Sequence, residues 1–134
     1  MKKIISIFII SSILLVSCGN SKKEETPKTK KAVVQKKITP QENIAKGKKL
    51  FGAKGCTACH FETTKIIGPS VKDIAEVYKK EKGEIFKFLR GENDPIVDLN
   101  TTQVAIMKAN ITSMVDKISD EDLANIIIYI KSVK

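Results

Sequence analysis

Two cysteines and a histidine stand close together in the segment Cys56-Thr57-Ala58-Cys59-His60. The pattern Cys-x-x-Cys-His is the attachment signature of a c-type haem. The two thiols can add to the two vinyl groups of a haem, and the adjoining imidazole can then bind the iron from the proximal side. His60 is the only histidine in the 134 residues, so no second imidazole competes for this role. The sequence therefore predicts one covalent haem c at Cys56 and Cys59, with His60 as proximal iron ligand.

Two other uses of a Cys-x-x-Cys pair have to be weighed. A redox-active thiol-disulfide pair of the thioredoxin kind is expected within a strand-helix-strand unit, whereas the flanking sequence here favours helices. A zinc site needs two further ligands. The one remaining cysteine, Cys18, has a different predicted role. Haem attachment is the interpretation that the spacing favours.

The first residues have the pattern of an export signal. Met1-Lys2-Lys3 is basic, and the apolar run from Ile4 to Val16 is too short to span a membrane comfortably. The following Leu15-Val16-Ser17-Cys18 resembles a bacterial lipoprotein box. This resemblance implies a signal peptide over 1–17, cleavage before Cys18 and lipid attachment to that cysteine. The predicted location is therefore a bacterial membrane, with the protein facing the periplasm or the cell exterior.

Residues 18–39 have the composition of a flexible, lysine-rich tether. Positions 19–37 hold seven lysines, two glutamates and no aromatic residue, and such a segment cannot bury enough apolar surface to fold. This stretch contributes +5 to the chain's net charge of +9, and the part after it contributes about +2. The basicity can attract anionic lipid headgroups or an acidic partner. It does not indicate nucleic-acid binding.

Residues 40–134 are expected to fold as one all-α domain. Thr39-Pro40-Gln41-Glu42 is a capping box with proline at the first helical position, and it predicts a helix to about Gly52. Gly47 within this helix would permit close approach of another helix. Three further helices are predicted from caps, glycine stops and apolar spacing: Ser70 to about Lys82, Glu84 to Arg90, and a terminal helix after Ser119 with a buried stripe of Leu123, Ile126, Ile127 and Ile130.

Together these residues resemble a small class I c-type cytochrome over nearly all of 40–134. Gly47 and Phe51 match the family's glycine and aromatic residue ahead of the haem motif, and Tyr129 matches an aromatic residue near the end of its terminal helix. The resemblance implies a cytochrome c fold in which the two terminal helices cross tightly. Gly68-Pro69 resembles the family's Gly-Pro, where a backbone carbonyl commonly accepts a hydrogen bond from the histidine ring.

The distal ligand is the open point of the sequence. Family members usually offer a methionine, and Met107 and Met114 are the candidates here. Met107-Lys108-Ala109-Asn110 resembles a Met-x-x-Asn pattern in which the Asn110 side chain would bond the methionine sulfur. Both methionines also belong to an apolar stripe at helix-like spacing, where methionine is ordinarily a gap-filler. Met107 is the favoured distal ligand, and Met114 is the alternative. A third hypothesis is that neither methionine binds the iron. The stripe comprises Val104, Met107, Ile111, Met114 and Ile118.

The leading functional hypothesis is single-electron transfer by a monomer that is not an enzyme. With His60 and a methionine on the iron, no position stays open for a substrate. The redox partners would be a quinol-oxidising complex on one side and a terminal oxidase, reductase or peroxidase on the other. Lys54, Lys65 and Lys108 could steer an acidic partner, or could simply be solvated. The alternative is a five-coordinate haem domain that senses a gas or acts like a peroxidase; a permanent subunit of a larger complex is a further reading.

Overall fold

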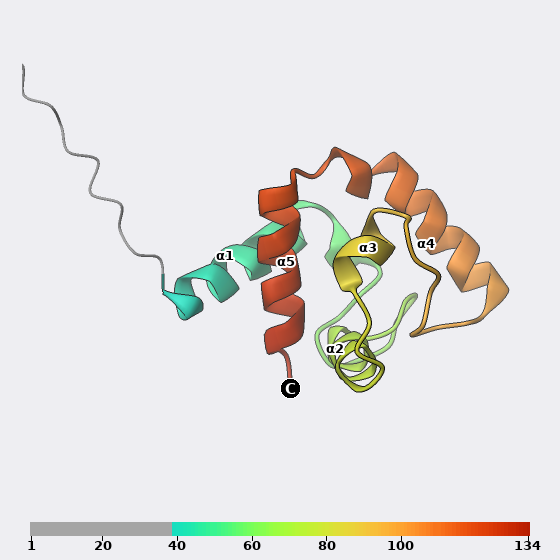
Figure 1. Ribbon diagram of the computed structural model, residues 1–134, viewed down its shortest axis with the longest axis horizontal. Coiled ribbons are helices and arrows are strands. Elements are labelled where there is room, and N and C mark those ends of the chain that lie inside the picture. The colour runs from blue at the N-terminus through green and yellow to red at the C-terminus, as the bar shows by residue number, and fades with distance from the viewer. Residues whose placement is uncertain (1–38) are drawn as a thin grey trace, which may run out of the picture. The chain divides into compact units, whose positions relative to one another are not determined.

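Helices make up the regular secondary structure of residues 39–134, the part of the chain that the computed structural model describes (Figure 1). The predicted signal peptide, the lipidated Cys18 and the tether up to residue 38 lie outside the described residues. The all-α prediction is confirmed. In chain order the elements are α1 (Pro40–Ala53), the 3-10 turn η1 (Cys56–Ala58), α2 (Val71–Lys80), α3 (Ile85–Leu89), α4 (Thr101–Ser113), the 3-10 turn η2 (Val115–Lys117) and α5 (Asp120–Ser132).

Helix α1 begins where its capping signal predicts. The backbone N–H of Thr39 donates to Glu42 Oε2 at 2.8 Å, and the N–H of Glu42 donates to Thr39 Oγ1 at 3.2 Å. Pro40 occupies the first helical position, where a missing N–H costs nothing. The helix ends at Ala53, and Gly55 then adopts a left-handed conformation with φ of 81°. This turn places η1, and so the Cys-x-x-Cys-His motif, directly at the end of α1.

Helices α1 and α5 cross at a glycine, as expected from the sequence. A Cβ at Gly47 would stand 2.0 Å from the carbonyl oxygen of Asn125 and 2.9 Å from the Cβ of Tyr129. Only glycine permits this approach of two backbones. The rings of Phe51 and Tyr129 pack edge to face at the crossing, with centroids 5.4 Å apart and an interplanar angle of 64°. This close packing of α1 against α5 forms the frame of the domain, and the motif follows directly from the end of α1.

Helix α5 supplies the largest share of the core. Ser119 caps it by accepting the N–H of Asp122 at 3.2 Å. Three acidic residues in its first turn complement the positive end of the helix dipole. The predicted apolar stripe is confirmed, because its four members are buried: Leu123, Ile126, Ile127 and Ile130.

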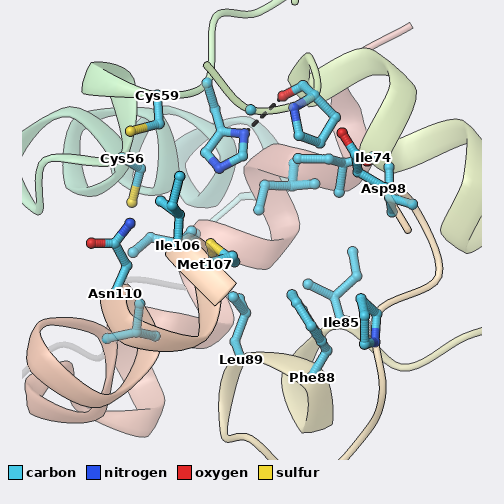
Figure 2. A pocket seen from close by; sticks show the side chains of 18 of the residues that line it. Cys56, Cys59, Ile74, Ile85, Phe88, Leu89, Asp98, Ile106, Met107 and Asn110 are labelled. Carbon is cyan, nitrogen blue, oxygen red and sulfur yellow. Dashed lines mark hydrogen bonds between the residues drawn. The ribbon is translucent and has the colours of Figure 1, made fainter. Parts of the chain in front are cut away.

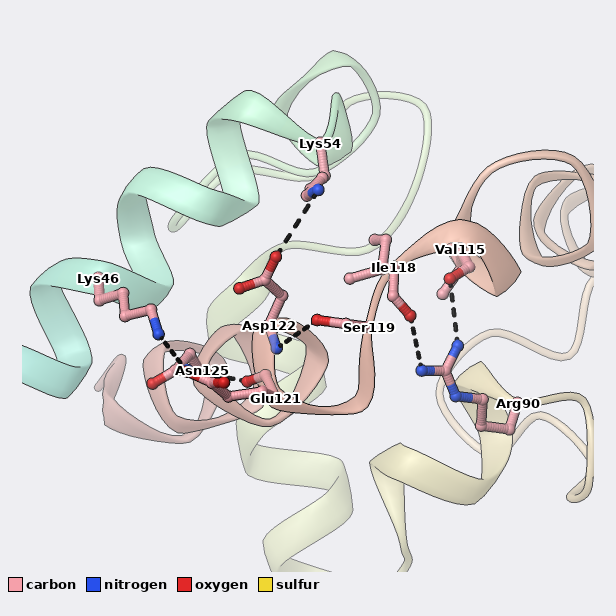
Figure 3. A network of polar contacts seen from close by, with 9 residues as sticks. All are labelled: Lys46, Lys54, Arg90, Val115, Ile118, Ser119, Glu121, Asp122 and Asn125. Atoms are coloured by element: carbon pink, nitrogen blue, oxygen red, sulfur yellow. Dashed lines mark hydrogen bonds and ion pairs between the residues drawn. The ribbon is translucent and has the colours of Figure 1, made fainter. Parts of the chain in front are cut away.

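Arg90 ties α3 to the segment that leads into α5 (Figure 3). Its guanidinium donates to the carbonyl oxygens of Val115 at 3.2 Å and Ile118 at 2.8 Å, and it pairs with Asp120 at 2.6 Å. The Arg90 side chain is only 14% exposed. Arg90 thus adds charged donors to two carbonyls at η2, of which that of Val115 also accepts the N–H of Ile118 at 2.9 Å.

Helix α4 differs in one respect from the predicted apolar stripe. Asn100 caps the helix by accepting the N–H groups of Thr102 and Gln103, and the helix ends at Ser113. Met114 is its C-cap residue, and Ile118 lies beyond η2, so the stripe is divided between two elements. Within α4 only Ile111 is buried. The apolar spacing correctly predicted a helix here, but the predicted stripe extends beyond the residue at which the helix ends.

None of the helices between residues 39 and 134 combines the length and the apolar character that crossing a membrane requires.

Candidate functional site: a cavity around the Cys-x-x-Cys-His motif

The cysteine motif is held in a tight turn by backbone hydrogen bonds. The N–H groups of Cys59 and His60 both donate to the carbonyl oxygen of Cys56, at 3.2 Å and 3.0 Å. The carbonyl of Cys59 in turn accepts the N–H of Gly68 at 2.9 Å. Both thiols are free and partly buried, and burial raises the pKa of the Cys56 thiol. The turn therefore presents two thiols and an imidazole to the same space.

The ring of His60 has a defined orientation. Its Nδ1–H donates to the carbonyl oxygen of Pro69 at 2.7 Å, the dashed line in Figure 2, which leaves Nε2 as the nitrogen available to a metal. Gly68 lies flat against the imidazole, because a Cβ there would stand 2.5 Å from His60 Cε1. The segment between them folds back on itself through a bridge between His60 and Lys65. A carbonyl acceptor of this kind raises the basicity of a metal-binding imidazole.

An apolar cavity opens beside the motif, with about 1180 Å³ of empty space including its open side. Figure 2 shows Cys56 and Cys59 on one side of it and Ile74, Ile85 and Asp98 on another. All the described residues that the sequence singled out for the haem site line this cavity: Cys56, Cys59, His60, Gly68, Pro69, Met107, Asn110 and Met114. An apolar cavity with thiols and one imidazole in its wall suits a flat, largely apolar ring that carries a metal.

The two candidate methionines occupy different parts of the cavity wall. Both are partly buried against the core. Met107 comes from the middle of α4, between Asp98, which precedes the helix, and Asn110, which lies on the Cys56 side in Figure 2. Met114 lies against the turn that carries the motif, with its sulfur 3.5 Å from where a Cβ of Gly55 would stand. Met107 is therefore the more central of the two, and Met114 is close to the cysteine edge.

Sequence reasoning did not find three polar side chains in the wall: Tyr78, Asp98 and Gln103. Gln103 stands four residues before Met107, so helical spacing could have placed it on the same face. Asp98 accepts the N–H of Asn100 at 3.0 Å and pairs with Lys65 at 2.9 Å. These contacts hold the pKa of Asp98 below its usual value. No local sequence pattern predicts an ion pair between residues as far apart in the chain as Lys65 and Asp98.

Two of the lysines named as steering charges are engaged with acids. Lys54 lies 3.7 Å from Asp122, and Lys65 lies 2.9 Å from Asp98. Lys108 is exposed on α4. Within residues 39–134 no group of three or more His, Cys, Asp or Glu side chains is placed to hold a metal ion. The zinc interpretation of the cysteine pair therefore finds no ligand set in the described part of the chain.

Comparison with known proteins agrees with the geometry of this cavity. The cytochrome c family model matches residues 44–134. The chain belongs to the cytochrome c family. It is also 40% identical over 37 residues to cytochrome c-551 of Azotobacter vinelandii, a match that covers 28% of this chain and 45% of that relative. The chain thus spans less than half the length of this curated relative.

Membership of the family has direct consequences for the cavity. This cytochrome carries a covalently bound haem c, and the Cys56–Cys59 pair fits its attachment site. The resemblance to class I c-type cytochromes is confirmed. Members of this family are haem-based electron-transfer proteins. When bound, the haem would supply one-electron chemistry, and Cys56, Cys59 and His60 are the residues that would hold it.

Proposed function

We propose that this cytochrome is a single-electron shuttle whose haem iron is held by His60 on the proximal side and Met107 on the distal side. The observation that carries the proposal is the position of Met107 in the middle of α4, along the wall that runs from Asp98 to Asn110. A ring anchored at Cys56 and Cys59 would present its centre to this part of the wall and its edge to Met114.

His/Met ligation suits electron transfer in two ways. It leaves no open coordination position, so exogenous ligands are excluded and little rearrangement accompanies the change of oxidation state. Methionine also raises the reduction potential by favouring the ferrous state. The hydrogen bond from His60 to Pro69 acts in the opposite direction, because a more basic imidazole favours the ferric state. The two contacts would therefore act on the reduction potential in opposite directions.

The proposed location is a membrane surface. The support is the resemblance of Leu15-Val16-Ser17-Cys18 to a lipoprotein box, with the lysine-rich segment 19–37 as a tether to the domain. A tether raises the effective concentration of the domain near membrane-bound partners. Those partners are proposed to be a quinol-oxidising complex as electron donor and a terminal oxidase, reductase or peroxidase as acceptor.

The test is the optical spectrum of the reduced holoprotein with and without carbon monoxide, for the wild type and for Met107→Ala and Met114→Ala. We expect the wild type and Met114→Ala to be indifferent to the gas, and Met107→Ala to bind it readily because its iron has lost a ligand. Ready binding by the wild type would overturn the closed site and favour the five-coordinate sensor or peroxidase. Binding by Met114→Ala alone would move the distal ligand to Met114.

A further inference from the structure

Arg90 joins two parts of the cavity wall that are far apart in the chain. It directly follows α3, whose Ile85 and Leu89 line the cavity. Its guanidinium donates to the carbonyl oxygens of Val115 and Ile118, whose side chains line the cavity from the η2 side (Figure 3). Arg90 itself is not part of the cavity lining. It therefore connects the two parts of the wall from behind.

The Arg90 side chain is firmly held on its own side. Helix α3 packs on α5. The backbone N–H of Arg90 donates to the carbonyl oxygen of Phe86 at 3.0 Å, and the guanidinium lies over the Phe86 ring, 5.4 Å from its centroid. A guanidinium fixed at its base and largely removed from water makes strong, directional hydrogen bonds. The contacts of Arg90 thus tie η2 to the α3–α5 part of the domain.

Both candidate methionines stand on the stretch that ends at these contacts. Met114 is shared by α4 and η2, because its N–H donates to the carbonyl of Asn110 at 2.9 Å and its own carbonyl accepts the N–H of Lys117 at 3.3 Å. Helix α4 and η2 therefore follow one another without a loop. We call residues 101–118 the methionine wall.

Packing gives the methionine wall only part of its attachment. Ile111 and Val115 are buried in the core, but apolar burial is non-directional and does not by itself fix the position of the wall. The main helical contact of α4 lies within the wall, with η2. The hydrogen bonds from Arg90 are directional and carry a charged donor. They supply a fixed attachment between the wall and α3.

We propose that Arg90 is a positioning residue for the distal methionine: by fastening the methionine wall to α3, it keeps the sulfur on the iron and the site closed to exogenous ligands. This inference rests on the methionine ligation proposed above, but it applies to either methionine, because Met107 and Met114 both precede the carbonyls that Arg90 binds. Arginine suits the task, since its rigid fork of N–H groups can meet two carbonyls at once. A lysine ammonium is a point charge on a flexible stem.

The test uses the Arg90→Lys holoprotein, which keeps the positive charge and loses the fork. The absorption that marks sulfur bound to ferric iron is followed during chemical denaturation, together with the circular dichroism of the helices. We expect this absorption to disappear well before the helices unfold. The population of the open site should rise by roughly ten- to a hundredfold, as the loss of hydrogen bonds to a charged group implies. The reduced variant should accordingly bind carbon monoxide faster than the wild type.

Two matched variants serve as controls. Lys46→Met removes the 2.7 Å ion pair with Glu121, which joins α1 to α5 and lies outside the methionine wall. Asp120→Asn removes the carboxylate partner of Arg90 and leaves both carbonyl contacts in place. Asp120 is 81% exposed, so its ion pair contributes little. Both controls should keep the sulfur–iron absorption and the response to carbon monoxide of the wild type.

Amide hydrogen exchange of the same holoproteins is the second measurement. Residues 101–118 should exchange faster in Arg90→Lys, while α1 stays unchanged. An Arg90→Lys protein with the wild-type sulfur–iron absorption and gas response would overturn the proposal, even if exchange in the wall became faster. Ready binding of carbon monoxide by the wild type would instead overturn the methionine ligation. The exchange data would then still show whether Arg90 fastens the wall, so the two failures are distinguishable.

Discussion

His60 owes its orientation to two adjacent residues that act through different means. Pro69 offers a carbonyl oxygen at 2.7 Å from Nδ1, and Gly68 offers the absence of a side chain against the ring face. The carbonyl of Pro69 fixes the tautomer of the imidazole. The missing side chain at Gly68 leaves room for the imidazole ring at the cavity wall. A Gly-Pro pair thus places the ring by backbone alone.

At the residue scale we predict that Gly68→Ala raises the reduction potential of the holoprotein. The added Cβ would stand 2.5 Å from His60 Cε1, so the ring must turn and its bond to Pro69 must weaken. A less basic imidazole supports the ferric state less well. Potentiometry and the ferric low-spin spectrum measure the effect. Pro69→Ala keeps the carbonyl acceptor and should change the potential much less, and an unshifted potential in folded Gly68→Ala would contradict the argument.

Some residues of the site could be predicted from the sequence and others could not. Cys56, Cys59 and His60 are neighbours in the chain, and the chemistry that needs them also dictates their spacing. Met107 is remote from the motif, and helical spacing alone equally permits a methionine that fills the core. Tyr78 and Asp98 carry no local pattern, because their position depends on how α2 and the segment before α4 meet.

At the element scale the crossing of α1 and α5 depends on two backbones in direct contact. Helical caps at Thr39 and Ser119 were predictable because they satisfy N–H groups within three residues. The crossing itself was predicted from Gly47. A glycine within a helix lowers the intrinsic stability of the helix, so its presence suggests that close contact with another helix compensates for the loss. The division of the stripe after Ser113 was not predictable, because Met114 and Val115 continue the apolar spacing while the backbone changes to η2.

We predict opposite effects for alanine at two glycines of α1. Gly47→Ala places a Cβ 2.0 Å from the carbonyl oxygen of Asn125, and backbone atoms cannot yield cheaply, so we expect a loss of roughly 1–3 kcal/mol or more in the free energy of unfolding. Gly52→Ala meets nothing within 4 Å, and better helix propensity should raise that free energy by up to about 1 kcal/mol.

Chemical denaturation of both holoproteins, followed by circular dichroism, measures these changes. Equal stability of Gly47→Ala and wild type would mean that the two helices can separate without cost, and the crossing would not be the frame of the domain.

At the scale of the whole domain, α4 is attached differently from the other helices. Helix α5 packs on α1, α2 and α3, whereas the main helical contact of α4 is with the adjoining η2. Figure 1 shows α4 on the opposite side of the domain from α1. The inner face of α4 borders the cavity instead, with Val104, Ile106 and Met107 in its wall. Ile111 of α4 is buried in the protein core, and a haem in this cavity would give the rest of the inner face apolar surface to pack against.

We predict that the full chain without haem, made as Cys56→Ala/Cys59→Ala, loses protection first in α4. Limited proteolysis with mass spectrometry should find cleavage between Leu99 and Ser113 well before cleavage in α1 or α5. The holoprotein should resist at the same sites, because local opening of α4 would then expose the ring as well. Uniform protection of all helices in the haem-free chain would show that α4 docks without the cofactor.

Because α4 packs mainly beside the cavity, the stability of this helix should depend on whether the haem has been attached. A chain that has not received its cofactor would present a loosely packed segment around Met107, whereas the crossing of α1 and α5 does not involve the cavity wall formed by α4. Housekeeping proteases that attack loose segments would remove such chains and spare the finished ones. Quality control of this cytochrome would then need no dedicated recognition factor, because the bound cofactor itself would protect the site of cleavage.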